Sequence, residues 1–147
     1  MASALVIGCG NSLRQDDGAG YCAAEQLNAA EFKSPVRVIA CQQLTPDLAS
    51  EMSNVDRVVL IDATAVGSPG DVLVQKVEPP DRIDTSITHE LQPGALLEAA
   101  RALFHSNAEM YLVTITGESF DFGAQLSRTV QAAMPEVYRR VIQLLGS

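Results

Sequence analysis

The sequence predicts an α/β fold in which helices cover both faces of a mostly parallel sheet. Short apolar runs, of the kind found in buried strands, alternate along the chain with longer amphipathic segments. This alternation is typical of parallel sheets whose strands are connected by helices. Hydrophobic residues make up 47% and charged residues 19% of the 147 positions, as in a compact domain. No linker, repeat or low-complexity tract divides the chain, so we expect residues 1–147 to form one domain.

Each expected strand is a short apolar run bounded by turn-forming residues. Strands are expected at residues 4–7, 36–40, 57–62, 71–77 and 111–115. The first run is apolar throughout, which predicts burial on both faces. The fourth alternates only loosely between apolar and polar residues, which predicts a strand at the edge of the sheet.

The expected helices show apolar residues that recur every three or four positions. They are expected at residues 18–30, 46–52, 93–104 and about 124–145. The predicted apolar stripes are Tyr21, Ala24, Leu27 and Ala30 in the first, and Leu96, Leu97, Ala100, Leu103 and Phe104 in the third. Thr45 is expected to cap the short second helix, with Pro46 as its first residue. Pro135 is expected to kink the last helix or to start a second segment.

Composition limits the partners and the location of the protein. A net charge of −8 argues against nucleic acid, because binding to phosphates needs clustered lysines and arginines. The apolar runs are too short to span a bilayer, and the N-terminus has no basic start of the kind found in signal peptides. We therefore expect a cytoplasmic monomer that contacts neither nucleic acid nor membrane.

Three cysteines give an odd count without C-x-x-C spacing, which predicts neither a zinc site nor a disulfide framework. Cys22 lies in an alanine-rich helix and is expected to be a small buried side chain. Cys9 and Cys41 follow the first and second strands, but no base stands beside either in the sequence. Since a nucleophilic thiol needs an activating base, we expect these thiols to be inert.

Three potential metal ligands are expected at one edge of the sheet. In parallel α/β sheets, ligands bind outside the carboxyl ends of the strands. Asp17 (or Asp16) follows the first strand, Asp62 closes the third, and His89 precedes a helix that should start at the same edge. Two carboxylates and an imidazole suit divalent transition metals such as zinc, nickel or manganese.

Each of these residues also has an ordinary structural explanation. Asp62 could cap the turn after its strand, and His89 could hydrogen-bond to the backbone at a helix start. The adjacent pair Asp16 and Asp17 is expected either to be solvated near the N-terminus of the next helix or to hold a cation. The sequence alone leaves these alternatives open.

Two other classes of α/β protein fit the sequence less well. Dinucleotide binding requires G-x-G-x-x-G, but Leu13 stands at the third glycine position, and no acidic residue follows the second strand. A receiver-like signalling module, or another non-enzymatic metal-binding module, would explain an acidic pair and Asp62. Receivers also need a lysine after the last strand, whereas Thr116, Gly117 and Glu118 stand there. The receiver-like module is the alternative to an enzyme.

Residues 8–20 contain three glycines, an asparagine and the acidic pair, and read GCGNSLRQDDGAG. This motif resembles the pattern G-x-G-N-x-L-x-x-D-[DE]-G-x-G that opens the [NiFe]-hydrogenase maturation endopeptidases. Residues 60–63 (LIDA) look like the family's second acidic position, and residues 86–91 (SITHEL) like its S-x-x-H motif. Residues 45–48 (TPDL) are similar to its P-E-L segment. At residues 40–44 (ACQQL) the chain departs from a D-G-G-T-like segment that is associated with substrate choice.

The resemblance implies a three-layer α/β/α sandwich around a five-stranded twisted sheet. It implies an endopeptidase that removes the C-terminal extension of a hydrogenase large-subunit precursor after nickel insertion. The residues that correspond to the metal-contacting set are Asp17, Asp62 and His89, which would be catalytic. The nickel would be carried by the substrate, and no tightly held cofactor is expected. A substrate-bound nickel would place the scissile peptide and polarise its carbonyl group or a water molecule.

Overall fold

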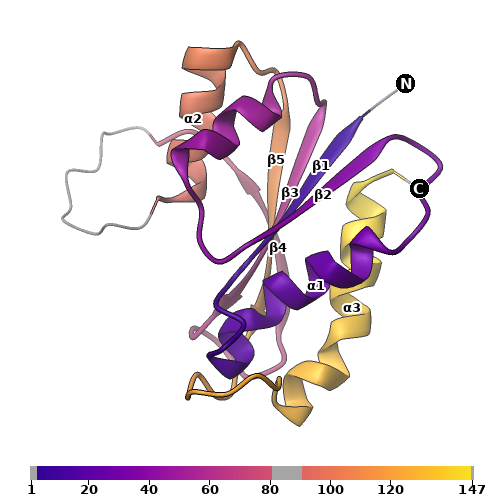
Figure 1. Ribbon diagram of the computed structural model, residues 1–147, viewed down its shortest axis with the longest axis vertical. Coiled ribbons are helices and arrows are strands. Elements are labelled where there is room, and N and C mark those ends of the chain that lie inside the picture. Colours follow the sequence, from indigo (N-terminus) through magenta and orange to yellow (C-terminus); the bar gives the residue numbers. More distant parts are fainter. Residues whose placement is uncertain (1–2, 81–90, 147) are drawn as a thin grey trace.

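The computed structural model describes residues 3–80 and 91–146, which form a five-stranded sheet between two layers of helices (Figure 1). The strands are β1 (Ala4–Cys9), β2 (Val36–Cys41), β3 (Arg57–Thr64), β4 (Val72–Val77) and β5 (Glu109–Thr116). The helices are α1 (Ala19–Asn28), α2 (Pro93–Phe104) and α3 (Arg128–Leu144), with two 3-10 helices, η1 (Gln15–Gly18) and η2 (Pro46–Met52). The strand order is β2-β1-β3-β5-β4, and only β4 runs antiparallel to its neighbour. The predicted α/β fold with a mostly parallel sheet is confirmed.

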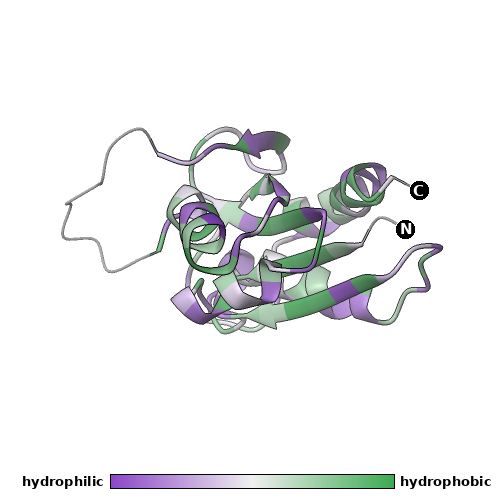
Figure 2. Ribbon diagram, turned by 90° about the horizontal axis from the view of Figure 1, so that it is seen from above, coloured by the Kyte–Doolittle hydropathy of each residue, from purple (hydrophilic) through white to green (hydrophobic). Residues whose placement is uncertain are grey.

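The sheet has a separate hydrophobic core on each face. One core packs alternate residues of β1 and β3 against η2 and α2, and the other packs the intervening residues against α1 and α3. Leu5 and Ile7 belong to the first core and Val6 to the second, as the two-residue period of a strand requires. Figure 2 shows the same division, with hydrophobic strands between helices that have both hydrophobic and hydrophilic residues. The predicted burial of β1 on both faces is confirmed.

The edge of the sheet was also predicted correctly. β4 lies at one end of the strand order and pairs with β5 alone. Its residues are partly or fully exposed, and Leu73 is 62% exposed. An antiparallel edge strand of this kind can leave one face in water, which explains its loose alternation of apolar and polar residues.

The apolar faces of two helices differ from the prediction. In α1 the buried face runs through Gly20, Ala23, Ala24 and Leu27, while Ala30 is exposed beyond the helix. The smallest residues face the sheet because α1 lies directly against β3: a Cβ at Gly20 would be 2.2 Å from the Ile61 carbonyl oxygen.

In α2 the predicted stripe is correct only in its first half. Leu96, Leu97 and Ala100 are buried, but Leu103 is 70% exposed and Phe104 is 39% exposed. The helix ends immediately afterwards, at His105 with a left-handed backbone conformation, so its last turn extends beyond the core.

The predictions about two helix starts were correct only in part. Thr45 and Pro46 stand at the predicted N-cap and first helical positions, but Thr45 makes no capping hydrogen bond through its side chain, and the helix that follows is a 3-10 helix. The last helix begins at Arg128 rather than near residue 124, with the Ser127 side chain accepting a hydrogen bond from the Val130 amide. α3 then continues through Pro135 as one helix.

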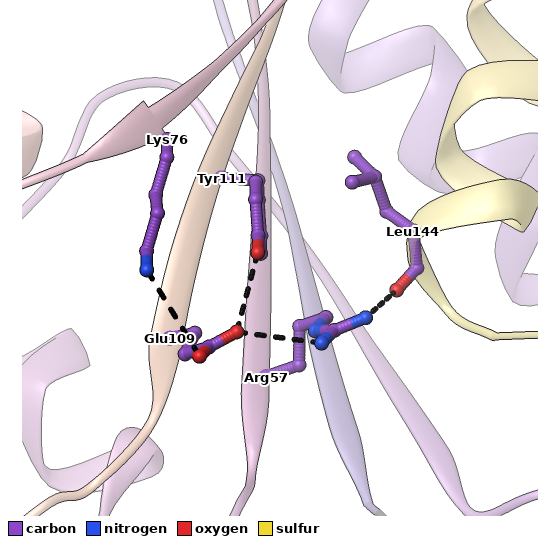
Figure 3. A network of polar contacts seen from close by, with 5 residues as sticks. All are labelled: Arg57, Lys76, Glu109, Tyr111 and Leu144. Atoms are coloured by element: carbon purple, nitrogen blue, oxygen red, sulfur yellow. Dashed lines mark hydrogen bonds and ion pairs between the residues drawn. The ribbon is translucent and has the colours of Figure 1, made fainter.

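A cluster of polar contacts lies at the amino ends of β3 and β5 (Figure 3). The Glu109 carboxylate contacts Arg57 Nη2 at 3.3 Å, Lys76 Nζ at 4.0 Å and the Tyr111 hydroxyl at 3.2 Å. Arg57 Nη1 also donates to the Leu144 carbonyl oxygen at 2.7 Å, which ties the end of α3 to the sheet. This cluster lies at the edge of the sheet opposite to the carboxyl ends of the parallel strands.

No helix in the described part of the chain combines the length and apolar character needed to cross a membrane.

Candidate active site

A pocket of about 230 Å³ lies at the carboxyl edge of the parallel strands. Its lining comes from the ends of β1, β2 and β3 and from the start of α2. The lining residues are Cys9, Gly10, Asp17, Gln42, Gln43, Leu44, Asp62, Ala63, Leu91, Gln92 and Pro93. Two predicted site residues, Asp17 and Asp62, therefore lie in the same pocket. Their chemical roles remain predictions.

Asp62 continues a row of side chains across the end of the sheet. Cys9 pairs with Cys41 in the β1–β2 register, and Gly8 pairs with Ile61 between β1 and β3, so Cys9 and Asp62 are the next residues along those strands. All three side chains lie on the face covered by α2, because the residues two positions earlier belong to that core. Asp62 Oδ1 accepts a hydrogen bond of 2.8 Å from the Ala63 amide. Cys9 and Asp62 of this row line the pocket.

Asp17 reaches the pocket through a tight glycine-rich turn after β1. Gly10 has φ +150°, and a Cβ there would be 1.8 Å from the Asp17 carbonyl oxygen. Asp17 Oδ2 accepts a hydrogen bond of 2.9 Å from the Asn11 amide, which fixes the carboxylate against its own loop. The glycines of the opening motif thus let the loop fold onto itself.

Asp16 has a different role from its neighbour. It is fully buried, and its carboxylate accepts hydrogen bonds from the backbone amides of Glu118, Ser119 and Ser127 at 2.7–3.0 Å. The Ser127 hydroxyl donates a further bond of 2.8 Å. Burial alone would raise the pKa of Asp16, but these donors stabilise the charged form more strongly, so the pKa lies below its ordinary value.

The expectation that the acidic pair is solvated or holds a cation is therefore wrong for Asp16. Its negative charge is stabilised by hydrogen bonds from N–H and O–H donors of the segment between β5 and α3. These donors also explain the late start of α3, since Ser127 is held by Asp16 before the helix begins. Asp16 ties the loop after β1 to the segment after β5 and so supports the position of Asp17.

Cys9, which lines the pocket, contacts Cys41 of the neighbouring strand. Their Sγ atoms are 3.0 Å apart, and both are free thiols. The mutual hydrogen bond, burial and the negative charges of Cys41 and Asp62 raise the pKa of Cys9. The same hydrogen bond lowers the pKa of Cys41, against the effects of burial and of Asp62 and Asp47. Either thiol can donate in this contact. Cys22, expected to be buried, is only partly buried.

His89, the third predicted ligand, lies outside the described residues. Within residues 3–80 and 91–146, no three His, Cys, Asp or Glu side chains are grouped as a metal site. The described part of the pocket is lined by two carboxylates, those of Asp17 and Asp62.

The helix at residues 93–104 was predicted to start at this edge of the sheet, but the sequence did not predict that residues 91–93 form a wall of the pocket. These residues precede or begin α2, and only the packing of α2 on the sheet brings them over the ends of β1 and β3. The position of Gln42 and Gln43 could be predicted, since they directly follow β2. Their side chains are exposed at the pocket edge, where they are available to a ligand.

The fold and the pocket place the chain among the α/β proteins that bind ligands at the carboxyl edge of a parallel sheet. Residues 22–144 match the family model described as HycI, hydrogenase maturation protease. The chain belongs to the hydrogenase maturation protease family and is a peptidase. This confirms the predicted family and decides against the receiver-like alternative. The match includes Asp62 and His89 and begins after Asp17.

Solved structures of similar fold carry corresponding names. The [NiFe] hydrogenase maturation protease HycI of Thermococcus kodakarensis KOD1 has a TM-score of 0.81 at 18% identity, over 99% of this chain and 94% of that one. The hydrogenase maturating endopeptidase HybD of E. coli has a TM-score of 0.74 at 22% identity, over 99% and 92%. The hydrogenase 2 maturation peptidase of Thaumarchaeota archaeon SCGC_AB-539-E09 has a TM-score of 0.74 at 24% identity, over 98% of each chain. No curated protein matches the sequence significantly.

Proposed function

We propose that this protein removes the C-terminal extension of a [NiFe]-hydrogenase large-subunit precursor after nickel insertion. The substrate-bound nickel is recognised through Asp17, Asp62 and His89. The observation that carries this proposal is the presence of Asp17 and Asp62, 45 positions apart in the sequence, in the lining of one pocket. Membership of the hydrogenase maturation protease family supports the substrate class.

The carboxylates are suited to contact an ion that arrives with the substrate. Each has one oxygen that accepts a backbone amide hydrogen, Asp17 from Asn11 and Asp62 from Ala63. These bonds hold the carboxylates in place before the substrate binds, which lowers the entropic cost of binding. Nickel accepts both carboxylate oxygens and imidazole nitrogens as ligands, so this donor set fits it.

The size of the pocket favours a small reacting segment. About 230 Å³ is below the range of roughly 300–1,000 Å³ found for drug-sized ligands. It admits a metal ion with its ligands and a short piece of extended peptide. Peptide hydrolysis there adds water across the scissile bond: the carbonyl carbon gains a hydroxyl group, the carbon–nitrogen bond breaks, and the new amine takes a proton.

The test uses a large-subunit precursor prepared with and without nickel. The protein is incubated with each form, and the precursor mass is measured over time. We expect a C-terminal peptide to be lost from the nickel-loaded form only. Cleavage of both forms at equal rates would contradict recognition through nickel. Binding without cleavage of the loaded form would contradict the proposed peptidase reaction.

A further inference from the structure

Two thiols from neighbouring strands meet beside the pocket, and one of them, that of Cys9, lines it. The Sγ atoms of Cys9 and Cys41 are 3.0 Å apart, and the two residues are partners in the parallel register of β1 and β2. Neighbouring strands lie about 4.8 Å apart, which is within the Cα separation of about 4.4–6.8 Å that a disulfide spans. The strands thus already hold both sulfurs on one face at a separation from which an S–S bond can form.

We propose that Cys9 and Cys41 are a redox-active dithiol that a hydroperoxide converts into an intramolecular disulfide. This inference goes beyond the peptidase reaction and does not depend on the identity of its substrate. It revises the expectation of inert thiols, which rested on the absence of a basic neighbour in the sequence. The pairing of two strands supplies the reaction partner that the sequence did not show.

The two sulfurs differ in their access to an oxidant. Cys41 is partly exposed, whereas Cys9 is only 5% exposed. An oxidant from solvent therefore meets Cys41 first, and Cys9 is placed behind it as the resolving thiol. Both residues are the last of their strands, and the Gly10 amide donates to the Cys41 carbonyl oxygen at 3.1 Å. The small movement that bond formation requires thus falls where the chain leaves the sheet.

The reaction balances in two steps. The Cys41 sulfur attacks the terminal oxygen of the hydroperoxide, so an S–O bond forms and the O–O bond breaks. The leaving alkoxide (hydroxide, from hydrogen peroxide) takes the Cys41 proton to give an alcohol (or water). The Cys9 sulfur then attacks the Cys41 sulfenic acid. The S–S bond forms, the S–O bond breaks, and the leaving hydroxide takes the Cys9 proton to give water. Together the two thiols lose two electrons, and the hydroperoxide gains them.

The disulfide would lie within the wall of the candidate active site. Cys9 lines the same pocket as Asp17 and Asp62, and Asp62 is its neighbour across the sheet. Oxidation replaces two thiols by one S–S bond at this position and ties the ends of β1 and β2 together. The modification is reversible, since an excess of dithiol reductant exchanges with the new bond.

Peptide mapping tests the proposal directly. The full chain is treated with hydrogen peroxide, and the protein is then alkylated and digested with trypsin. The peroxide concentration is one that oxidises the same thiols in urea-unfolded protein. Trypsin places the cysteines in different peptides, Cys9 in residues 1–14, Cys22 in residues 15–33 and Cys41 in residues 38–57. We expect peptides 1–14 and 38–57 to be recovered as one disulfide-linked species, about 2 Da lighter than their sum. Dithiothreitol should separate them.

Matched variants make the assignment specific. Cys22 lies in α1, which packs on the opposite face of the sheet, so Cys22→Ser should form the same linked species at the wild-type rate. Neither Cys41→Ser nor Cys9→Ala should form the linked species. Circular dichroism checks that both variants fold.

Three results would overturn the proposal. One is recovery of peptides 1–14 and 38–57 as separate alkylated species. Another is their recovery with separately oxidised thiols. The third is a link from either peptide to residues 15–33.

Discussion

Asp16 and Asp17 are consecutive in the chain, yet Asp16 is fully buried among hydrogen-bond donors whereas Asp17 lines the pocket. Both residues lie within the 3-10 helix η1, so their side chains point in different directions. The Asp16 donors come from residues more than 100 positions away, at Glu118, Ser119 and Ser127. One carboxylate therefore holds the fold together and leaves the other available for a ligand.

Asp16→Asn should destabilise the fold by about 3 kcal/mol. The amide has a single acceptor oxygen, and its NH₂ group would face N–H donors, so buried donors would lose their partners. We expect a lower midpoint of urea unfolding with an unchanged slope. Asp17→Asn is the matched control, since its amide oxygen can still accept the Asn11 hydrogen, and it should change stability by less than ~1 kcal/mol.

Acid should remove the stability that the ionised Asp16 carboxylate gives to the wild-type protein. The pKa of Asp16 is lower in the folded state than its ordinary value of 3.8, so the ionised carboxylate stabilises the fold above that pH. This stability is lost as the pH falls through the folded-state pKa. Urea unfolding between pH 7 and pH 2 should show a constant difference between wild type and Asp16→Asn down to about pH 4, and a shrinking one below it. A difference that stays constant to pH 2 would contradict this role of Asp16.

Ser127→Ala should cost about 2 kcal/mol of stability. Its hydroxyl donates to Asp16 at 2.8 Å and accepts from the Val130 amide at 3.3 Å, so the change removes both an anchor of Asp16 and the N-cap of α3. Ser119→Ala is the control, because the hydrogen bonds between Ser119 and Asp16 use the Ser119 backbone N–H and carbonyl oxygen and not its side chain. Thermal unfolding should show a clear loss for the first variant and little change for the second. Equal losses would mean that the serine hydroxyl does not anchor Asp16.

The course of the strands could be predicted because buried parallel strands are apolar runs, as in β1 and β3. The shared position of Asp17 and Asp62 followed from the rule that parallel strands end at one edge of the sheet. The Asp16 anchor could not be predicted, since its donors are backbone amides, which every residue other than proline carries. The Cys9–Cys41 contact depends on the register of β1 and β2, to which two adjacent apolar strands give no reliable sequence signal.

Gly10→Ala should disrupt the turn that positions Asp17. The new Cβ would be 1.8 Å from the Asp17 carbonyl oxygen, and φ is +150°, so the backbone itself must move. We expect a destabilisation of at least ~3 kcal/mol, measured by chemical unfolding. Gly123→Ala is the matched control, because its Cβ would meet only the Gln15 side chain, at 3.2 Å, and flexible side chains can move aside. Its effect should stay within about 1 kcal/mol. A tolerated Gly10→Ala would show that this turn is not held by backbone contact.

Asp62→Asn should abolish precursor cleavage while leaving the fold intact. Asparagine keeps an oxygen to accept the Ala63 amide hydrogen, but it removes the negative charge that we propose contacts the substrate-bound nickel. We expect kcat/KM for the nickel-loaded precursor to fall at least ~100-fold, with an unfolding midpoint close to that of the wild type.

Glu109→Gln is the matched acidic control for Asp62→Asn. Glu109 lies at the opposite edge of the sheet, in the contacts with Arg57 and Lys76 (Figure 3). Because these ion pairs are about half exposed, the change should cost less than ~1 kcal/mol and leave cleavage at the wild-type rate. If both variants lowered cleavage equally, loss of negative charge anywhere on the protein would explain the effect, and a specific role of Asp62 would be excluded. If Asp62→Asn cleaved at the wild-type rate, its carboxylate would not take part in recognising nickel.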